Sequence, residues 1–332
     1  MACNRRVGAG RNFLSGILHR LGFVATEVDQ SLYIFCRKTA VIAIWIHVDN
    51  GVITSTLVDA ISDFKEALIS QLDNKWSNKL DRIVGLECSF GDGEVARTQR
   101  QLTDSILEAY PQRIVAHDSP LLVLPVGVPT LNAPPVDTTP FQSVIGSLAY
   151  LVSGSRPDLA FAVNYLTRHS MGPTPAHWDL LDHVVGYLRK TRDQGICLCP
   201  GNISLNLWGG DLERSQTGFV LKLGNTPILW GSKRQSVVAL STCAAEYIAL
   251  SDSTQHLVQV INQLGQLVRD FSKAIFCNNQ AAVQVLIDNK LRKRMSQQAR
   301  PHSLAACMRK INRVILKKRA PFNAKLVSIG GD

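Results

Sequence analysis

The chain has 332 residues, of which 45% are hydrophobic, and a formal net charge of +10. This length predicts about two domains, and the hydrophobic content excludes a chain that is disordered throughout. No apolar run reaches the ~18–20 residues that a membrane span needs, so we expect no membrane partner. The longest apolar run, Ala40–Val48, has the size of a strand.

Eight cysteines are spread over the whole length without a dense disulfide spacing. This usage is typical of reduced thiols in an intracellular protein, cytoplasmic or nuclear. The basic N-terminus lacks an apolar segment and a cleavage site, so we expect no secretory signal. Cys197 and Cys199 are separated by one residue, which is not the spacing of a zinc ribbon.

The positive charge is concentrated towards the C-terminus. Residues 288–332 hold twelve Lys or Arg residues and two acids, so the preceding residues carry 24 of each sign. We expect this basic segment to contact nucleic-acid phosphates; a nuclear import signal and a solvated tail are the alternatives. The candidate contact residues are Arg292, Lys293, Arg294, Arg309, Lys310, Arg313, Lys317, Lys318 and Arg319. Leu304, Met308, Ile311 and Ile315 fall on one face of a helix in the same segment.

The N-terminal block alternates between helical and strand periodicity. Its predicted helices are Arg11–Gly22, Ala60–Leu72 and Leu102–Tyr110, and its predicted strands are Ser31–Cys36, Ala40–Val48, Val52–Thr54, Ile83–Phe90 and Glu94–Thr98. Asp49-Asn50-Gly51 separates two of these strands. Because Asn-Gly between apolar strands is a strong turn signal, we expect a hairpin there.

The remainder of the chain predicts a linker, a helical region and an α/β layer. Six prolines between Ser119 and Pro140 predict an extended linker. The predicted helices after it are Phe141–Ser153, Asp158–His169, Pro175–Thr191, Ala244–Leu267 and Asn279–Asp288. The predicted strands are Ile196–Cys199, Ser204–Trp208, Thr217–Leu223, Ile228–Trp230 and Lys273–Cys277. Strands followed by helix, strand and helix are typical of a mixed sheet.

Three stretches resemble the Pol polyprotein of copia-type LTR retrotransposons. Val24–Ile34, followed by an apolar strand and His47-Val48-Asp49-Asn50, is similar to the reverse-transcriptase palm, where the family has Tyr-Val-Asp-Asp. Phe141–Gly195, with Ser155-Arg156-Pro157-Asp158, is similar to the segment that links polymerase to ribonuclease H. Trp230–Gln235 and Ala239–Leu250 are similar to the family's ribonuclease H.

The resemblance implies a mixed α+β and α/β chain. Residues 1–118 would form a partial palm and thumb-like region, 119–140 a proline-rich linker, 141–193 connecting helices, 194–288 a ribonuclease H-like mixed-sheet domain, and 289–332 the basic segment. The implied activities are RNA-directed DNA synthesis and hydrolysis of the RNA strand of RNA–DNA hybrids, and the implied cofactor is Mg²⁺.

The palm resemblance implies three metal-binding carboxylates, of which the chain retains one. The first would lie upstream of the hairpin, before the point where this sequence begins. Asp49 matches the second, and Asn50 stands where the family has the third. A neutral amide is a weak substitute for a carboxylate as a ligand of Mg²⁺.

The ribonuclease H resemblance implies four acids around two metal ions. Leu205, Glu246, Asn278 and Leu304 stand at these positions. Since only Glu246 is an acid, we expect neither reaction to proceed and any Mg²⁺ at Asp49 or Glu246 to be weakly held or lost.

Two further hypotheses remain open. A host could retain the fragment as a non-catalytic module that binds nucleic acid, such as an RNA–DNA hybrid, or another protein. Alternatively, relocated acids could rebuild the ribonuclease site, from Asp211, Glu213 or Asp252. The oligomeric state is undetermined by the sequence.

Other candidate residues have simpler interpretations. His177 and His183 are six positions apart on one predicted helix and face different sides, so we expect packing or surface roles and no metal pair. Trp208 and Trp230 are predicted to belong to the core of the ribonuclease H-like sheet.

Overall fold

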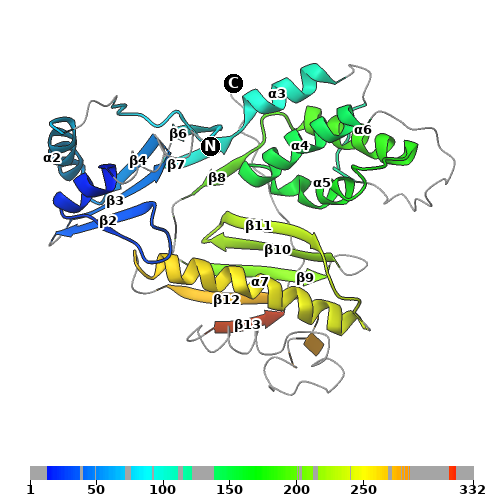
Figure 1. The fold of residues 1–332 in the computed structure, drawn as a ribbon. Helices are drawn as coiled ribbons and strands as arrows, with labels where there is room; N and C mark the ends of the chain where they lie inside the picture. Colours follow the sequence, from blue (N-terminus) through cyan, green and yellow to red (C-terminus); the bar gives the residue numbers. More distant parts are fainter. Residues whose placement is uncertain are drawn as a thin grey trace. The chain divides into compact units, whose positions relative to one another are not determined.

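The computed structural model describes residues 13–37, 40–48, 50–71, 76–91, 93–110, 115–121, 138–199, 201, 204–211, 216–239, 241–267, 271–277, 279, 281–282, 284 and 314–318. The chain forms two compact units: Met1–Ile83 with Gln259–Asp270, and Val84–Val258 with Phe271–Asp332. Figure 1 shows their elements. Among the described helices, none is both long enough and apolar enough to cross a membrane.

The first unit is built on an antiparallel sheet of order β1-β2-β3-β4. Its elements are a helix over residues 13–20, β1 (Val24–Ala25), β2 (Leu32–Arg37), β3 (Ala40–His47), β4 (Asn50–Ser55), α2 (Val58–Ile69) and β5 (Arg82–Ile83). Ile42 and Ile44 alternate along β3 and pack with Ile17 and Phe64 from the two helices in one buried cluster. The predicted helices and strands of this region are confirmed.

The β3–β4 hairpin turns earlier in the sequence than expected. His47 pairs with Asn50 and Ile46 pairs with Gly51, so Asn50 and Gly51 belong to β4. Val48 lies in the turn with φ +56°, a conformation that β-branched residues seldom adopt. The expected hairpin is therefore confirmed, but its turn precedes Asn50 and does not lie at Asn50-Gly51, because the register that buries the apolar face of β3 outweighs the local turn preference.

In the second unit, β6 (Leu86–Gly91), β7 (Glu94–Thr98) and β8 (Ile196–Leu198) form an antiparallel sheet. We expected Ile196–Cys199 to open the later mixed sheet, and this is wrong: β8 pairs with β7, placing Cys197 opposite Ala96. Gly195 permits the approach, since a Cβ there would lie 2.4 Å from the Arg97 carbonyl oxygen.

A helical group follows in the same unit. Its elements are α3 (Arg100–Ala109), α4 (Thr139–Gly154), the short 3₁₀ helix η1 (Pro157–Leu159), α5 (Ala160–Thr167) and α6 (Pro175–Lys190). Phe141, Leu148, Leu166 and Leu181 lie in its buried core. The three helices predicted here are confirmed, while residues 122–137 of the predicted linker lie outside the described residues.

A buried ion pair joins the ends of these helices. Arg156 is only 1% exposed, and its guanidinium donates hydrogen bonds to both carboxylate oxygens of Asp158 at 2.8–3.2 Å. It also donates to the carbonyl and hydroxyl oxygens of Thr191, just after α6, at 2.9 and 2.6 Å. Because these bonds satisfy the planar guanidinium on two sides, the charge is tolerated in the core.

The mixed sheet has the order β11-β10-β9-β12-β13. Its strands are β9 (Ser204–Asp211), β10 (Gln216–Leu223), β11 (Thr226–Arg234), β12 (Ser272–Cys277) and β13 (Val314–Lys318), and α7 (Thr242–Leu264) packs against it. β9, β10 and β11 are antiparallel, whereas β12 and β13 run parallel to β9. A Cβ at Gly209 would lie 3.1 Å from the Ser253 hydroxyl, so glycine allows α7 to approach β9. The expected mixed sheet is confirmed.

The C-terminal segment contributes a strand where helical spacing had indicated a helix. Ala274 of β12 pairs in parallel with Ile315, and Cys277 pairs with Lys318. The helix expectation is therefore wrong at Ile315, because β12 offers a strand edge for the segment to pair with. Leu304, Met308 and Ile311 lie outside the described residues. Of the helix expected over Asn279–Asp288, residues 281, 282 and 284 are helical and the rest is not described, apart from Asn279.

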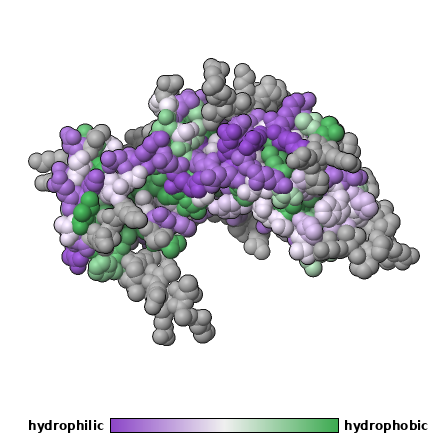
Figure 2. Space-filling model, turned by 90° about the horizontal axis from the view of Figure 1, so that it is seen from above, coloured by the Kyte–Doolittle hydropathy of each residue, from purple (hydrophilic) through white to green (hydrophobic). Residues whose placement is uncertain are grey.

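The surface drawn in Figure 2 is largely polar. Hydrophilic residues surround smaller hydrophobic areas on the face that this view shows. Large apolar side chains that are exposed include Phe90, Tyr150 and Met171, from three separate segments. Isolated exposed apolar residues of this kind are ordinary for globular proteins.

We expect Arg156→Gln to lower the free energy of unfolding by about 3–5 kcal/mol, because it leaves the Asp158 carboxylate buried without its cation. Urea unfolding followed by circular dichroism measures the change. Arg192→Gln is the matched control, since Arg192 makes an exposed ion pair with Asp104 and exposed pairs contribute about 0–1 kcal/mol. Equal effects of the two substitutions would contradict the assignment.

Candidate functional site

The centre of the mixed sheet is apolar where the resemblance implies an acid. Leu205 lies near the start of β9 and is fully buried, as is Leu207 two positions on. In the sheet, Leu205 pairs with Leu223 on β10 and Lys273 on β12. A leucine side chain offers no ligand atom, so this position contributes packing and no metal binding.

Glu246 is the one acid of the expected set that the structure describes. It lies in the buried N-terminal half of α7 and is 6% exposed. The Sγ of Cys277, at the end of β12, lies 3.9 Å from its Oε2. Burial raises the pKa of the Cys277 thiol to about 11, and the negative charge of Glu246 contributes to the rise. At neutral pH a neutral thiol therefore stands beside Glu246. Asn278 and Leu304 lie outside the described residues.

The surroundings of Glu246 do not fit a two-Mg²⁺ centre. Such a centre needs several anionic oxygens held around paired ions. In the described part of the chain, one group of three His, Cys, Asp or Glu side chains has ligand atoms close enough to share an ion, and it consists of Glu94, Cys197 and Cys199. Glu246 is not in that group, and the described residues near it supply no further set of acids.

A relocated acid is not brought to Glu246 either, as far as the described side chains extend. Asp252 follows it by six residues on α7, which places the two about 120° apart around the helix. Burial raises the pKa of Asp252, and the charges of Lys233 and His256 oppose that rise. The side chain of Asp211 and the whole of Glu213 lie outside the description.

The β3–β4 hairpin presents a neutral residue at a strand end. Asn50 begins β4 opposite His47, and the His47 ring stacks on Trp45 with 5.5 Å between ring centres. Both Asn50 and His47 are exposed. Asp49 is not among the described residues, so its role stays a prediction.

The histidines are confirmed as packing residues. His177 is 2% exposed, and its Nδ1 accepts a hydrogen bond of 3.0 Å from the Thr174 backbone N–H, capping α6. His183 instead contacts the Ser119 carbonyl oxygen at 2.8 Å and stacks on His117. Since their partners differ, they form no metal pair with each other.

Of the basic residues predicted to contact nucleic acid, the structure describes the backbone of Lys317 and Lys318 in β13. Arg292, Lys293, Arg294, Arg309, Lys310, Arg313 and Arg319 lie outside the described residues. The charge of this segment therefore remains an inference from sequence.

The structure adds two arginines that sequence reasoning missed. Arg168 follows α5 and Arg234 ends β11; both are exposed, and we call them the arginine pair. Burial and the nearby charge of Arg234 lower the pKa of Arg168. Neither makes an ion pair with any described acid. Neighbouring cations without an acidic partner attract anions, and the 66 positions that separate the two arginines in the sequence hid this proximity.

Hydrogen bonds between α5 and the sheet bring the arginine pair together. The amide of Gln216, 2% exposed, donates to Asn164 Oδ1 at 2.9 Å and to the Ser232 hydroxyl at 2.8 Å. Asn164 lies one helical turn before Arg168, and Ser232 lies two residues before Arg234. The contact between the two elements that carry the arginines thus includes a buried amide.

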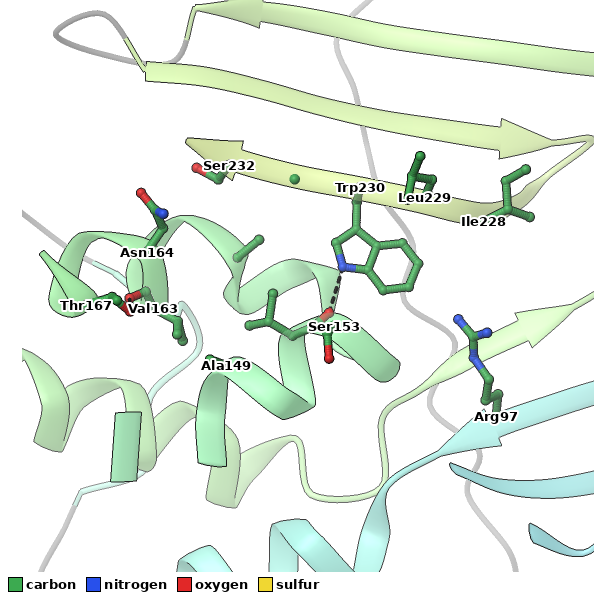
Figure 3. A pocket seen from close by; sticks show the side chains of 13 residues that line it. Arg97, Ala149, Ser153, Val163, Asn164, Thr167, Ile228, Leu229, Trp230 and Ser232 are labelled. Carbon is green, nitrogen blue, oxygen red and sulfur yellow. Dashed lines mark hydrogen bonds between the residues drawn. The ribbon is translucent and has the colours of Figure 1, made fainter. Parts of the chain in front are cut away.

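A cavity of about 540 Å³ adjoins this contact, between β11 and helices α4 and α5. Figure 3 shows the indole of Trp230 in it, donating a 2.7 Å hydrogen bond to the Val152 carbonyl oxygen. The guanidinium of Arg97 lies 5.9 Å from the Trp230 ring centre. Trp230 is half-buried and lines this cavity, so the prediction that it belongs to the core of the sheet is wrong. The side chain of Trp208 is not described.

Most of the relatives named by comparison with known proteins are Pol polyproteins or other proteins of transposons. No family model matches. The chain is 30% identical over 294 residues to the "Retrovirus-related Pol polyprotein from transposon RE2" of Arabidopsis thaliana, covering 83% of this chain and 20% of that protein. It is 38% identical over 127 residues to "Secreted RxLR effector protein 161" of Plasmopara viticola, covering 36% of this chain and 89% of that one. The chain thus spans about a fifth of the Pol relatives.

A foamy viral protease-reverse transcriptase, solved in complex with double-stranded DNA, is similar over 84% of this chain and 46% of its own. The sequence identity is 12% and the TM-score is 0.45.

We expect Leu205→Asp to destabilise the mixed sheet by more than Leu205→Ala, for which a buried leucine costs about 2–5 kcal/mol. The added penalty comes from placing a carboxylate in an apolar core. Urea unfolding of both variants measures it. An aspartate tolerated at no greater loss than alanine would mean that the surroundings still accommodate a carboxylate.

Proposed function

Because the chain belongs to the retrovirus-related Pol polyproteins of copia-type transposons, we propose that it is a reverse transcriptase and ribonuclease H fragment that binds nucleic acid without catalysing either reaction. The observation that carries the catalytic part is the fully buried Leu205 on β9, where the resemblance places an acid. Two-metal hydrolysis stabilises both the attacking and the leaving oxygen through paired ions. Among the residues that the structure describes, Glu246 is a single acid beside a protonated thiol, and one carboxylate does not supply the charge that two Mg²⁺ ions need.

Binding is supported by charge placement. The arginine pair offers two exposed guanidinium groups from adjoining elements, and the basic segment adds ten net positive charges over residues 288–332. Arginine recognises phosphate through paired hydrogen bonds. We infer that phosphates of a duplex, an RNA–DNA hybrid included, contact the arginine pair and the basic segment together.

The catalytic part is tested with purified chain, a labelled RNA–DNA hybrid and either Mg²⁺ or Mn²⁺. We expect no cleavage above background, and no difference between the natural chain and Glu246→Gln, because the described residues around Glu246 do not form a two-metal site. Metal-dependent cleavage that Glu246→Gln abolishes would refute the proposal.

The binding part is tested by titrating hybrid and duplex DNA at several salt concentrations. We expect the double substitution Arg168→Gln with Arg234→Gln to reduce the slope of log K against log salt by about two, because two phosphate contacts are lost. Arg100→Gln is the control, since Asp193 already pairs with Arg100 at 3.0 Å. Affinity that is independent of salt, or equally weakened by the control, would contradict phosphate contact by the arginine pair.

A further inference from the structure

Two thiols and a carboxylate lie together where β7 and β8 pair. The Cys197 thiol donates a 2.9 Å hydrogen bond to Glu94 Oε2, and the sulfur atoms of Cys197 and Cys199 are 3.3 Å apart. The ligand atoms of all three residues lie within 4.8 Å of one another. Glu94 is exposed and both cysteines are half-buried, so solvent reaches the group. We call it the thiol cluster.

Strand geometry and a buried threonine build this cluster. Cys197 and Cys199 alternate along the chain and so point to the same face, and the register that pairs Val95 with Leu198 continues to bring Glu94 opposite Cys199. Thr226, 5% exposed, accepts a 3.1 Å hydrogen bond from the Cys199 N–H and donates one of 3.3 Å to the Cys197 carbonyl oxygen. The backbone carrying both thiols is thereby fixed before any ligand binds.

We propose that the thiol cluster is a binding site for a thiophilic divalent cation of the Zn²⁺ class. Two thiolates and one carboxylate are ordinary zinc ligands, and three protein ligands leave the fourth tetrahedral position to water. With Zn–S bonds of about 2.3 Å, tetrahedral geometry places two sulfurs about 3.8 Å apart, so the observed pair needs to separate only slightly. Thiolate selects against Mg²⁺, which prefers oxygen ligands.

Without the ion, the cluster carries two protons that binding would release. Burial raises the pKa of Cys197, with the hydrogen bond to Glu94 adding to the rise. Hydrogen bonds from Cys197 and Cys199 lower the pKa of Glu94, which keeps its carboxylate charged. Zn²⁺ displaces both thiol protons to solvent and then bonds two thiolates and one carboxylate. Affinity therefore falls as pH falls.

A bound ion would close a long loop of the chain. β8 is the edge strand of its sheet, and the cluster joins it to a residue that precedes Cys197 by 103 positions. Metal ligation that closes so long a loop restricts the unfolded chain and stabilises the folded one. The ion would therefore add stability to the part of the chain that carries the arginine pair, while its fourth position stays open to solvent.

The first test uses the full natural chain, reduced and freed of metal, with Zn²⁺ as the probe. Each cysteine's rate of alkylation by iodoacetamide is measured by peptide mass spectrometry. We expect Zn²⁺ to slow alkylation of Cys197 and Cys199 by at least about tenfold, because a ligated thiolate is not free to react. The exposed Cys36 should react at an unchanged rate. Unchanged rates at Cys197 and Cys199 would overturn the proposal.

The second test compares variants by Zn²⁺ competition with a chromophoric chelator, and by thiolate-to-metal absorption after Co²⁺ loading. We expect Cys197→Ser with Cys199→Ser to remove one bound ion, and Glu94→Gln to weaken binding by about tenfold or more. Cys36→Ser and Cys277→Ser are controls that should retain the ion. If Cys277→Ser lost the ion and the double variant kept it, the ion would bind beside Glu246 and the proposal would be overturned. A disulfide between Cys197 and Cys199 that persists under reducing conditions would also overturn it.

Discussion

The buried ion pair of Arg156 and Asp158 is the constraint on which the functional part of the second unit depends. It fixes the turn between α4 and α5 and ties that turn to Thr191 at the end of α6. Because α5 leads directly to Arg168, the same interaction decides where one of the two arginines lies. A charge in the core is a poor source of stability by itself; here it selects one arrangement of three helix ends.

The mixed sheet forms without the acids that the family resemblance implies. Leu205 and Leu207 fill the central strand with apolar packing, and α7 rests on that strand at Gly209. Hydrophobic burial and close packing hold such a sheet together, whereas catalytic carboxylates usually add repulsion and desolvation. Loss of the acids is therefore compatible with retention of the fold, and it leaves Glu246 buried beside a thiol.

Binding and metal ligation in this chain depend on contacts between distant segments. The arginine pair is assembled by Gln216, which links α5 to β11 through Asn164 and Ser232. The thiol cluster is assembled by the pairing of β7 with β8 and by Thr226. Both arrangements are fixed by hydrogen bonds of buried residues, so a ligand meets preformed geometry and little ordering free energy is spent on binding.

The sequence by itself determined most helices and strands, the mixed sheet and the Pol family. Hydrophobic periodicity and short motifs depend only on residues that are close together in the chain. The sequence also shows directly which residues stand at the expected acid positions. Only the tertiary structure decided that β8 pairs with β7, that the β3–β4 turn precedes Asn50, and that Ile315 lies in a strand. It also brought Glu94 to Cys197 and Arg168 to Arg234. The position of the β3–β4 turn depends on the register of two neighbouring strands, and the other results depend on contacts between segments far apart in the chain. Local periodicity carries no information about either.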